Sequence, residues 1–288
     1  MKQPLIIILI VFLFPALLVS QTLKPYIHGA TASGSMDEAR STVKKQLTTS
    51  GLKILGSYQP ASDATRYVYV VKSIGGLTGF GAALRVALTE ENGAIVITYT
   101  NPPYWGNAYF RDDFPKVKKH YDRFEKKLKK AMAGCGKPVG SSFGSEDGLD
   151  IDDLRDYYYM VFMPEFDDTN VLKEFKSHAE AISRIEGNCK KGVKNVSLVY
   201  AVEIPGKELK LYGFALAGPD GESDFLPTID IAKPKHTAFL PYEFLVMGNE
   251  VHMLHGRFRI ALSFPDLTMG TFTKIMSTPG AIEALLTS

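Results

Sequence analysis

Hydrophobic residues recur at helical spacing at both ends of residues 35–133 and form strand-like runs between them. Ser35 and Glu38 make a capping box, in which each side chain bonds a backbone amide at the helix start. The helix that this predicts ends at Gly51, and a second helix with one apolar face is predicted over 115–132. The strands expected between them are 52–58, 66–72, 84–89 and 94–100, the last two joined by an Asn-Gly hairpin turn.

Residues 134–156 interrupt this pattern with glycine and serine, followed by acidic side chains, and we predict a linker there. It separates an N-terminal lobe, residues 21–133, from a C-terminal lobe, residues 157–288. The second lobe is expected to contain strands at 157–163, 196–204, 208–217, 239–247, 250–254 and 258–264, and helices at 170–186, 271–276 and 280–286. Helices beside consecutive antiparallel strands predict an α+β fold of two lobes, each an antiparallel sheet packed with helices.

An internal similarity accompanies this layout. The segment Arg85–Leu88 resembles Arg259–Leu262, and the residue spacing of 102–109 resembles that of 265–272. The two alignments exclude each other, because the Asn-Gly hairpin separates the paired segments in the first lobe alone. A diverged duplication is therefore a hypothesis that the sequence leaves open.

The N-terminus has the parts of a secretory signal peptide. Lys2 supplies a positive charge, the stretch from Leu5 to Leu18 is almost unbroken in its apolar character, and the chain turns polar at Ser20. This stretch is shorter than the roughly 20 residues that a spanning helix needs. We predict a cleaved signal peptide at residues 1–20 and a secreted or periplasmic protein, with an uncleaved membrane anchor as the alternative.

Composition and charge narrow the range of partners. Apolar residues make up 45% of the chain and charged residues 22%, which is ordinary for a globular protein. The net charge of +2 gives no electrostatic basis for binding nucleic acid. Lysines gather between Lys116 and Lys130, in the second predicted helix. Peripheral membrane contact through that helix is one interpretation, and an ordinary solvated helix face is the other.

Cys135 and Cys189 are the two cysteines, and each follows a stretch predicted to be helical. In an oxidising compartment such a pair forms either a disulfide, which would join the lobes, or two free thiols. The sequence does not decide between them, because a disulfide depends on the distance between the two Cα atoms.

Four short segments of the N-terminal lobe carry a resemblance to a known family: Ser50–Gly56, Leu84–Leu88, Tyr99–Tyr104 and Ala108-Tyr109. They resemble the bacterial domain of unknown function 302 family over about residues 35–133. The resemblance implies a compact α+β domain in an exported bacterial protein. The family brings no assigned reaction, so the resemblance implies no catalytic residue and no cofactor.

The most unusual segment is 101–110, which holds four aromatic residues, including the single Trp, together with two prolines and two Asn. As a loop past a strand end, it would present rigidly held aromatic rings to a ligand. The alternative is a hydrophobic plug folded beneath its own sheet. The candidate ligand-binding residues are Asn101, Tyr104, Trp105, Tyr109 and Arg85.

No pattern in the sequence indicates a metal, a cofactor or a catalytic site. His252 and His255 are three residues apart on a predicted strand and therefore face opposite sides. The acidic residues of 147–153 lack the spacing of a calcium loop, and glycine-rich 75–81 lacks the lysine of a phosphate loop. We expect no catalytic residue, no metal and no cofactor.

These observations favour a noncatalytic binding module in the cell envelope, whose partner is a small apolar molecule or an envelope protein. The first alternative is an enzyme with a site between the lobes, built on Arg85, Asn101, His252 and Arg257. The second is a structural envelope protein, which would present a large exposed apolar patch.

Overall fold

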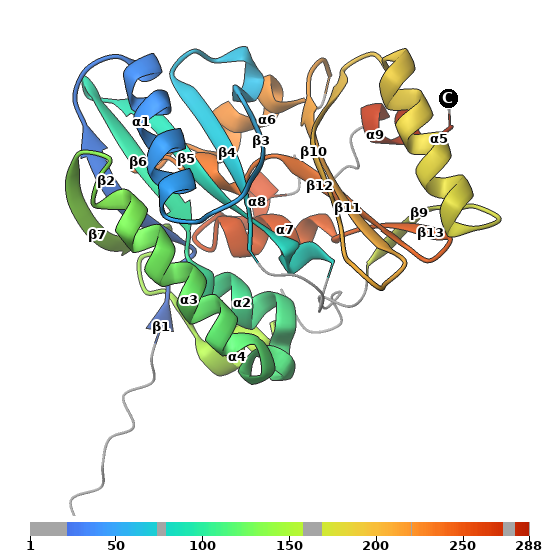
Figure 1. The fold of residues 1–288 in the computed structure, drawn as a ribbon, viewed down its shortest axis with the longest axis horizontal. Coiled ribbons are helices and arrows are strands. Elements are labelled where there is room, and N and C mark those ends of the chain that lie inside the picture. Colours follow the sequence, from blue (N-terminus) through green and yellow to red (C-terminus); the bar gives the residue numbers. More distant parts are fainter. Residues whose placement is uncertain (1–21, 74–78, 158–168, 220, 273–279, 288) are drawn as a thin grey trace, which may run out of the picture.

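The computed structural model describes residues 22–73, 79–157, 169–219, 221–272 and 280–287, and contains two larger antiparallel sheets packed with helices (Figure 1). This confirms the predicted α+β class. The first sheet has the strand order β3-β4-β5-β6-β2-β7 and the second has the order β10-β11-β12-β13-β9. The strands of the first sheet are β2 (Tyr26–Ala32), β3 (Ile54–Tyr58), β4 (Arg66–Lys72), β5 (Ala83–Glu91), β6 (Ala94–Thr100) and β7 (Lys137–Phe143). Those of the second are β9 (Asn170–Glu174), β10 (Val196–Glu203), β11 (Leu209–Leu216), β12 (Tyr242–Met247) and β13 (Glu250–Met253), and β1 (Thr22–Leu23) pairs separately with β8 (Leu149–Asp150).

The helices follow the chain around both sheets. The α-helices are α1 (Met36–Thr49), α2 (Pro102–Phe110), α3 (Phe114–Met132), α4 (Ile151–Arg155), α5 (His178–Lys191), α6 (Glu222–Ile229), α7 (Gly256–Ser263), α8 (Met269–Phe272) and α9 (Gly280–Thr287). Short 3-10 helices are η1 (Pro60–Ser62), η2 (Phe80–Ala82), η3 (Arg111–Asp113) and η4 (Thr237–Phe239). The predicted capping box is present, because the Ser35 side chain accepts from the Glu38 amide and the Glu38 carboxylate accepts from the Ser35 amide.

Different parts of the chain cover the two faces of the first sheet. Tyr69 of β4 donates a hydrogen bond to the carbonyl oxygen of Arg40 in α1. Arg66, three residues earlier in the same strand, therefore points to the opposite face, where it bonds Asp230 and Thr237. Helices α1 and α3 thus lie on one face of the sheet, and the chain from α6 to η4 lies on the other (Figure 1).

Part of the predicted linker is folded. Residues 137–143 form β7, which pairs with β2 at the edge of the first sheet, and the segment also contains β8 and α4. Almost every side chain of β7 is exposed, so this strand lacks the apolar alternation by which a half-buried strand is recognised. The first sheet therefore extends beyond residue 133, and the Gly- and Ser-rich sequence belongs to an edge strand.

Several predicted elements differ in type. The predicted strand 258–264 lies mostly in α7, and the predicted loop 101–110 is largely α2. Both helices are buried on more than one side, so their apolar residues do not follow a single helical stripe. The helix predicted from residue 170 begins only at His178, since residues 170–174 form β9. The predicted strand at 157–163 lies almost entirely outside the described residues.

The two cysteines are not bonded to each other. Cys135 is buried just past α3, where its thiol lies 3.2 Å from the carbonyl oxygen of Ala131. Cys189 lies in α5, next to the second sheet. The disulfide alternative between the lobes is therefore wrong for this structure, and the free-thiol alternative holds.

The two sheets meet along their outermost strands, β3 and β10 (Figure 1). Arg85 of β5 and Glu243 of β12 form a buried ion pair across this junction, and the Tyr200 hydroxyl donates to the same carboxylate. Buried apolar residues of both lobes belong to one continuous cluster. The lobes therefore share one interior. Among the described residues, no helix has both the length and the apolar character needed to cross a bilayer.

Candidate functional site

The predicted aromatic segment lies inside the protein. Tyr104, Trp105 and Tyr109 of α2 are 0%, 3% and 4% exposed. The Tyr104 hydroxyl donates to the carbonyl of Leu262 at 2.9 Å, and Trp105 Nε1 donates to that of Pro25 at 3.0 Å. Backbone acceptors thus satisfy these polar atoms while the rings pack in the core. The segment is the hydrophobic plug of the two alternatives, and it does not present an open ligand platform.

The other two candidate residues are also buried, in different places. Asn101 precedes α2, and its Nδ2 donates to the carbonyl of Lys24 at 2.7 Å. Arg85 faces the junction of the sheets, where it pairs with Glu243. Neither side chain is free to bind a ligand without giving up a buried contact.

The residues of the enzyme hypothesis do not converge. His252 lies on β13 of the second sheet, with Nδ1 2.8 Å from the hydroxyl of Thr169. Arg85, Asn101 and His252 make no hydrogen bond to one another, and the side chain of Arg257 lies outside the described part of the chain. Within the described ranges, His, Cys, Asp and Glu side chains form no group of three that could hold a metal ion.

A groove of about 500 Å³ lies on the face of the first sheet that α6 and η4 cover, at its β7 edge. Lys24 and three stretches line it: the end of β7 with the following loop, residues 142–146; the connection after α6, residues 229–236; and the chain after α7, residues 264–271. Its size falls in the roughly 300–1,000 Å³ range of small-molecule sites. Its apolar lining includes Phe143, Ile229, Phe264 and Leu267.

The groove wall that follows α6 is fixed to the sheet by buried polar contacts. Arg66 of β4 forms an ion pair with Asp230, which is 3% exposed. Asp230 also accepts from the backbone amide of His236 at 2.7 Å. The amide of Lys235 donates to the carboxylate of Glu91 in β5 at 2.9 Å. These contacts hold an irregular segment in one place, and they set the position of His236.

His236 is the buried polar residue of the groove. Its Nδ1 lies 3.0 Å from the carbonyl oxygen of Ser263. Because a carbonyl oxygen only accepts, Nδ1 carries the hydrogen and Nε2 keeps its lone pair. The ring stacks on Phe264 with centroids 4.7 Å apart, and lies 4.9 Å from the ring of Tyr26. Burial lowers the pKa of His236, which favours the neutral ring, although Asp230 opposes this shift. Nε2 has no hydrogen-bond partner within the described part of the chain, and it is a ready acceptor.

The charged residues around the groove balance one another. Lys24 and Lys233 oppose Glu146 and Asp266, which gives no net charge among these four side chains. Ile231 also lines the groove and is 71% exposed, an unusual position for a large apolar side chain. The groove thus offers apolar contact, one buried acceptor and no net charge.

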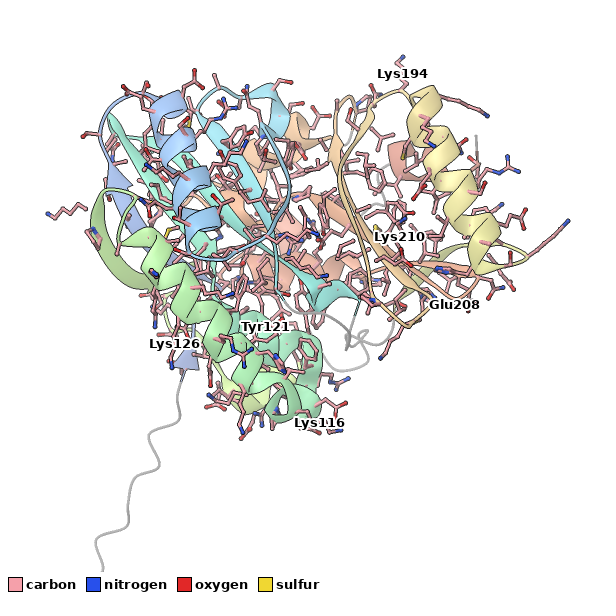
Figure 2. All side chains as sticks on the ribbon, viewed as in Figure 1. Lys116, Tyr121, Lys126, Lys194, Glu208 and Lys210 are labelled. Atoms are coloured by element: carbon pink, nitrogen blue, oxygen red, sulfur yellow. The ribbon has the colours of Figure 1, made fainter. Side chains whose placement is uncertain are left out.

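The lysine-rich face of α3 is separate from the groove. Lys116 and Lys126 project outward from this helix in Figure 2, whereas Tyr121 of the same helix is buried. Three ion pairs offset part of the charge: Lys116–Asp113, Lys118–Asp122 and Lys129–Glu125. The balance is that of a solvated helix face, and membrane contact stays an untested prediction.

Sequence reasoning did not identify His236. It lies between two prolines in a stretch with no helical or strand period, so spacing carries no sign of its burial. One signal was available, which is the length of the connection 217–241 between two strands that pair directly. Segments that connect the strands of a sheet often carry functional residues.

Comparison with known proteins adds no assignment for the groove. The resemblance to the domain of unknown function 302 family stays a prediction, because it rests on short segments of sequence. Protein-family models, curated proteins and solved structures give no match to this chain.

Proposed function

We propose that the protein is a noncatalytic binding module for a small, uncharged, mainly apolar molecule that carries a hydrogen-bond donor. The observation that carries this proposal is His236, which lines the groove beside its apolar residues, with Nδ1 held by the carbonyl oxygen of Ser263 and Nε2 without a hydrogen-bond partner in the described part of the chain. A hydroxyl or amide group of the ligand would donate to Nε2, and its apolar body would contact Phe143 and Phe264.

The charge balance supports an uncharged ligand. Lys24 and Lys233 would attract an anion, but Glu146 and Asp266 would repel it. A cation would be attracted by the two carboxylates and repelled by the two lysines. Electrostatic selection for either sign is therefore weak. Apolar contact supplies most of the affinity, and a single polar contact sets the orientation.

Naphthol and naphthalene form a matched pair of probes, because they differ by one hydroxyl group. We expect naphthol to bind the wild-type protein more tightly, by roughly 3- to 10-fold, the value of one hydrogen bond. His236→Asn keeps a donor near the position of Nδ1 and removes Nε2, so it should abolish the preference while naphthalene still binds. His236→Gln, which keeps an acceptor near the position of Nε2, serves as the control.

Titration calorimetry with the three proteins and both probes tests this. Equal binding of naphthol and naphthalene by the wild type would rule out His236 as the recognising group. Absence of binding by either probe, with no small molecule retained in native mass spectrometry of protein purified from its own host, would rule out the groove as a ligand site.

We also propose that the protein is exported by a signal peptide at residues 1–20 and acts in the periplasm or outside the cell. The support is the charge and apolar pattern of Lys2 and Leu5–Leu18. The intact mass of protein from its own host should lack residues 1–20. A mass that includes them would rule out cleavage.

A further inference from the structure

Two stretches of the chain build sheets with the same connectivity. The first unit, residues 26–100, runs β2-α1-β3-β4-β5-β6, and the second unit, residues 170–253, runs β9-α5-β10-β11-β12-β13. In both units the first strand along the chain pairs with the last strand. The strand orders are therefore β3-β4-β5-β6-β2 and β10-β11-β12-β13-β9. Every pairing in these two series is antiparallel.

A β-bulge fixes the residue equivalence between the two units. The ladder of β3 with β4 skips Leu55, and that of β10 with β11 skips Val199. If these two residues are equivalent, the pair Gly56–Val70 corresponds to Tyr200–Gly213. Val70 pairs with Arg85, and Gly213 pairs with Glu243. Arg85 and Glu243 therefore occupy the same position in the two units.

A second bulge, on another strand, provides an independent check. The residue two positions after Arg85 in β5 pairs with Thr98 of β6, and the residue two positions after Glu243 in β12 pairs with His252 of β13. Thr98 is therefore equivalent to His252. Thr98 pairs with His28 just before the bulge at Gly29, and His252 pairs with Val171 just before the bulge at Leu172. When the two units are aligned by their first bulge, their second bulges therefore also fall at equivalent residues. Bulges are persistent features within families of proteins, so their coincidence indicates a common origin.

The helices that follow the first strands match as well. Helices α1 and α5 each have 14 residues, with Ser35 and Ser177 as N-caps and a Glu three positions later in both. Counted from the cap, Ala39 corresponds to Ala181 and Val43 to Ile185, and all four side chains are buried. Each helix also contacts the equivalent strand, β5 or β12.

Contacts between the units are reciprocal. The bulged strands β3 and β10 lie against each other, and the equivalent residues Arg85 and Glu243 form an ion pair. Helix η2, just before β5, contacts β12, and η4, before β12, contacts β5. In a two-fold interface, a patch meets its own copy in this way, and residues near the axis meet their own equivalents.

We infer that residues 26–100 and 170–253 are diverged copies of one β-α-β-β-β-β unit, joined in one chain as an internal two-fold dimer across β3 and β10. The symmetry is broken where the connection 217–241 is longer than its counterpart 73–82. This longer connection supplies one wall of the groove, including His236. This residue equivalence is incompatible with the sequence alignment of Arg85–Leu88 with Arg259–Leu262. The first segment lies in β5, whereas the second lies in helix α7.

Exchange of the two charges tests the equivalence. Arg85→Glu and Glu243→Arg should each lower the Tm strongly, and the double variant R85E/E243R should recover more than half of the loss, because equivalent positions present similar surroundings. The control is R66D/D230R, whose buried partners are not equivalent. It should recover little, because Asp230 also accepts from the His236 amide. If both double variants recover the lost Tm to the same extent, or if neither recovers it, the inference is overturned.

A crystal structure of the unmodified chain is a second test, and it does not require any variant to fold. The rotation that places residues 26–100 on 170–253 should be two-fold, and it should superpose Leu55 on Val199 and Gly29 on Leu172. A rotation far from two-fold, or a register in which only one bulge coincides, would overturn the inference.

Discussion

Gly56 of β3 lies directly against the carbonyl group of Val199 in β10. A Cβ built on Gly56 would overlap that oxygen and would lie 3.0 Å from Cβ of Tyr200. Close approach of two backbones requires a residue without a side chain at this point. The close approach of β3 to β10 therefore requires glycine at position 56.

Gly56→Ala should destabilise the protein because β3 and β10 must separate to admit the methyl group. Steric overpacking of this kind costs about 1–3 kcal/mol. Gly187→Ala is the matched control, since it lies within α5 and its Cβ would meet nothing within 4 Å. Alanine has a higher helix propensity than glycine, so Gly187→Ala should stabilise the folded protein by about 0.5–1 kcal/mol. Urea unfolding of both variants measures the contrast, and equal stability of the two would contradict the tight joint.

Removal of the carboxylate at the junction should cost far more than removal of an exposed one. Glu243→Ala leaves the buried Arg85 without its ion-pair partner, and loss of one member of such a pair costs about 3–5 kcal/mol. Asp122→Ala breaks the exposed pair with Lys118 and should cost less than about 1 kcal/mol. Thermal unfolding distinguishes them. Similar losses in both variants would mean that water reaches the Arg85–Glu243 pair.

Protonation of His236 should make stability fall on the acid side of neutrality. Burial lowers the pKa of His236 in the folded protein, while Asp230 and Asp266 oppose the shift and Lys235 adds to it. The unfolded chain then binds a proton first, so stability is full above about pH 6.5 and declines as the pH falls through that value. We expect the free energy of unfolding of the wild type to drop more between about pH 7.5 and about pH 5.5 than that of His236→Asn.

His28 also has its pKa lowered by burial, but it is present in both proteins and its contribution cancels in the comparison. The same titration should weaken naphthol binding, since a protonated Nε2 is a donor and no longer accepts. Parallel stability profiles for wild type and variant would show that His236 does not titrate in this range.

Local signals predicted the regular parts of the fold well. The capping box at Ser35 and the apolar stripe of α3 are confirmed, because each depends on neighbours within a few residues. The Asn92-Gly93 turn is confirmed too, with φ of 52° and 76° at its two residues. Strands β4 and β6 also match their predicted ranges.

Long-range packing explains what the sequence did not disclose. The exposed strand β7 needs no apolar pattern, and the described side chains of α2 and α7 are almost all buried, so no exposed polar stripe reveals a helical period. His236 acquires its role from Arg66 and Ser263, which lie far from it in sequence or on another element. Such contacts depend on the tertiary fold, and a periodicity argument does not reach them.

The two thiols should be free in the purified protein and should differ in reactivity from exposed cysteine. Burial raises the pKa of Cys135 to about 11, and it raises the pKa of Cys189 above its usual value. Because the thiolate is the reactive form, both should react slowly with maleimide near neutral pH, with Cys135 the slower. Unfolding in urea should expose both and allow two additions. Intact mass spectrometry without reductant measures this, and a mass two hydrogens lighter that admits no maleimide after unfolding would mean that the cysteines are bonded after all.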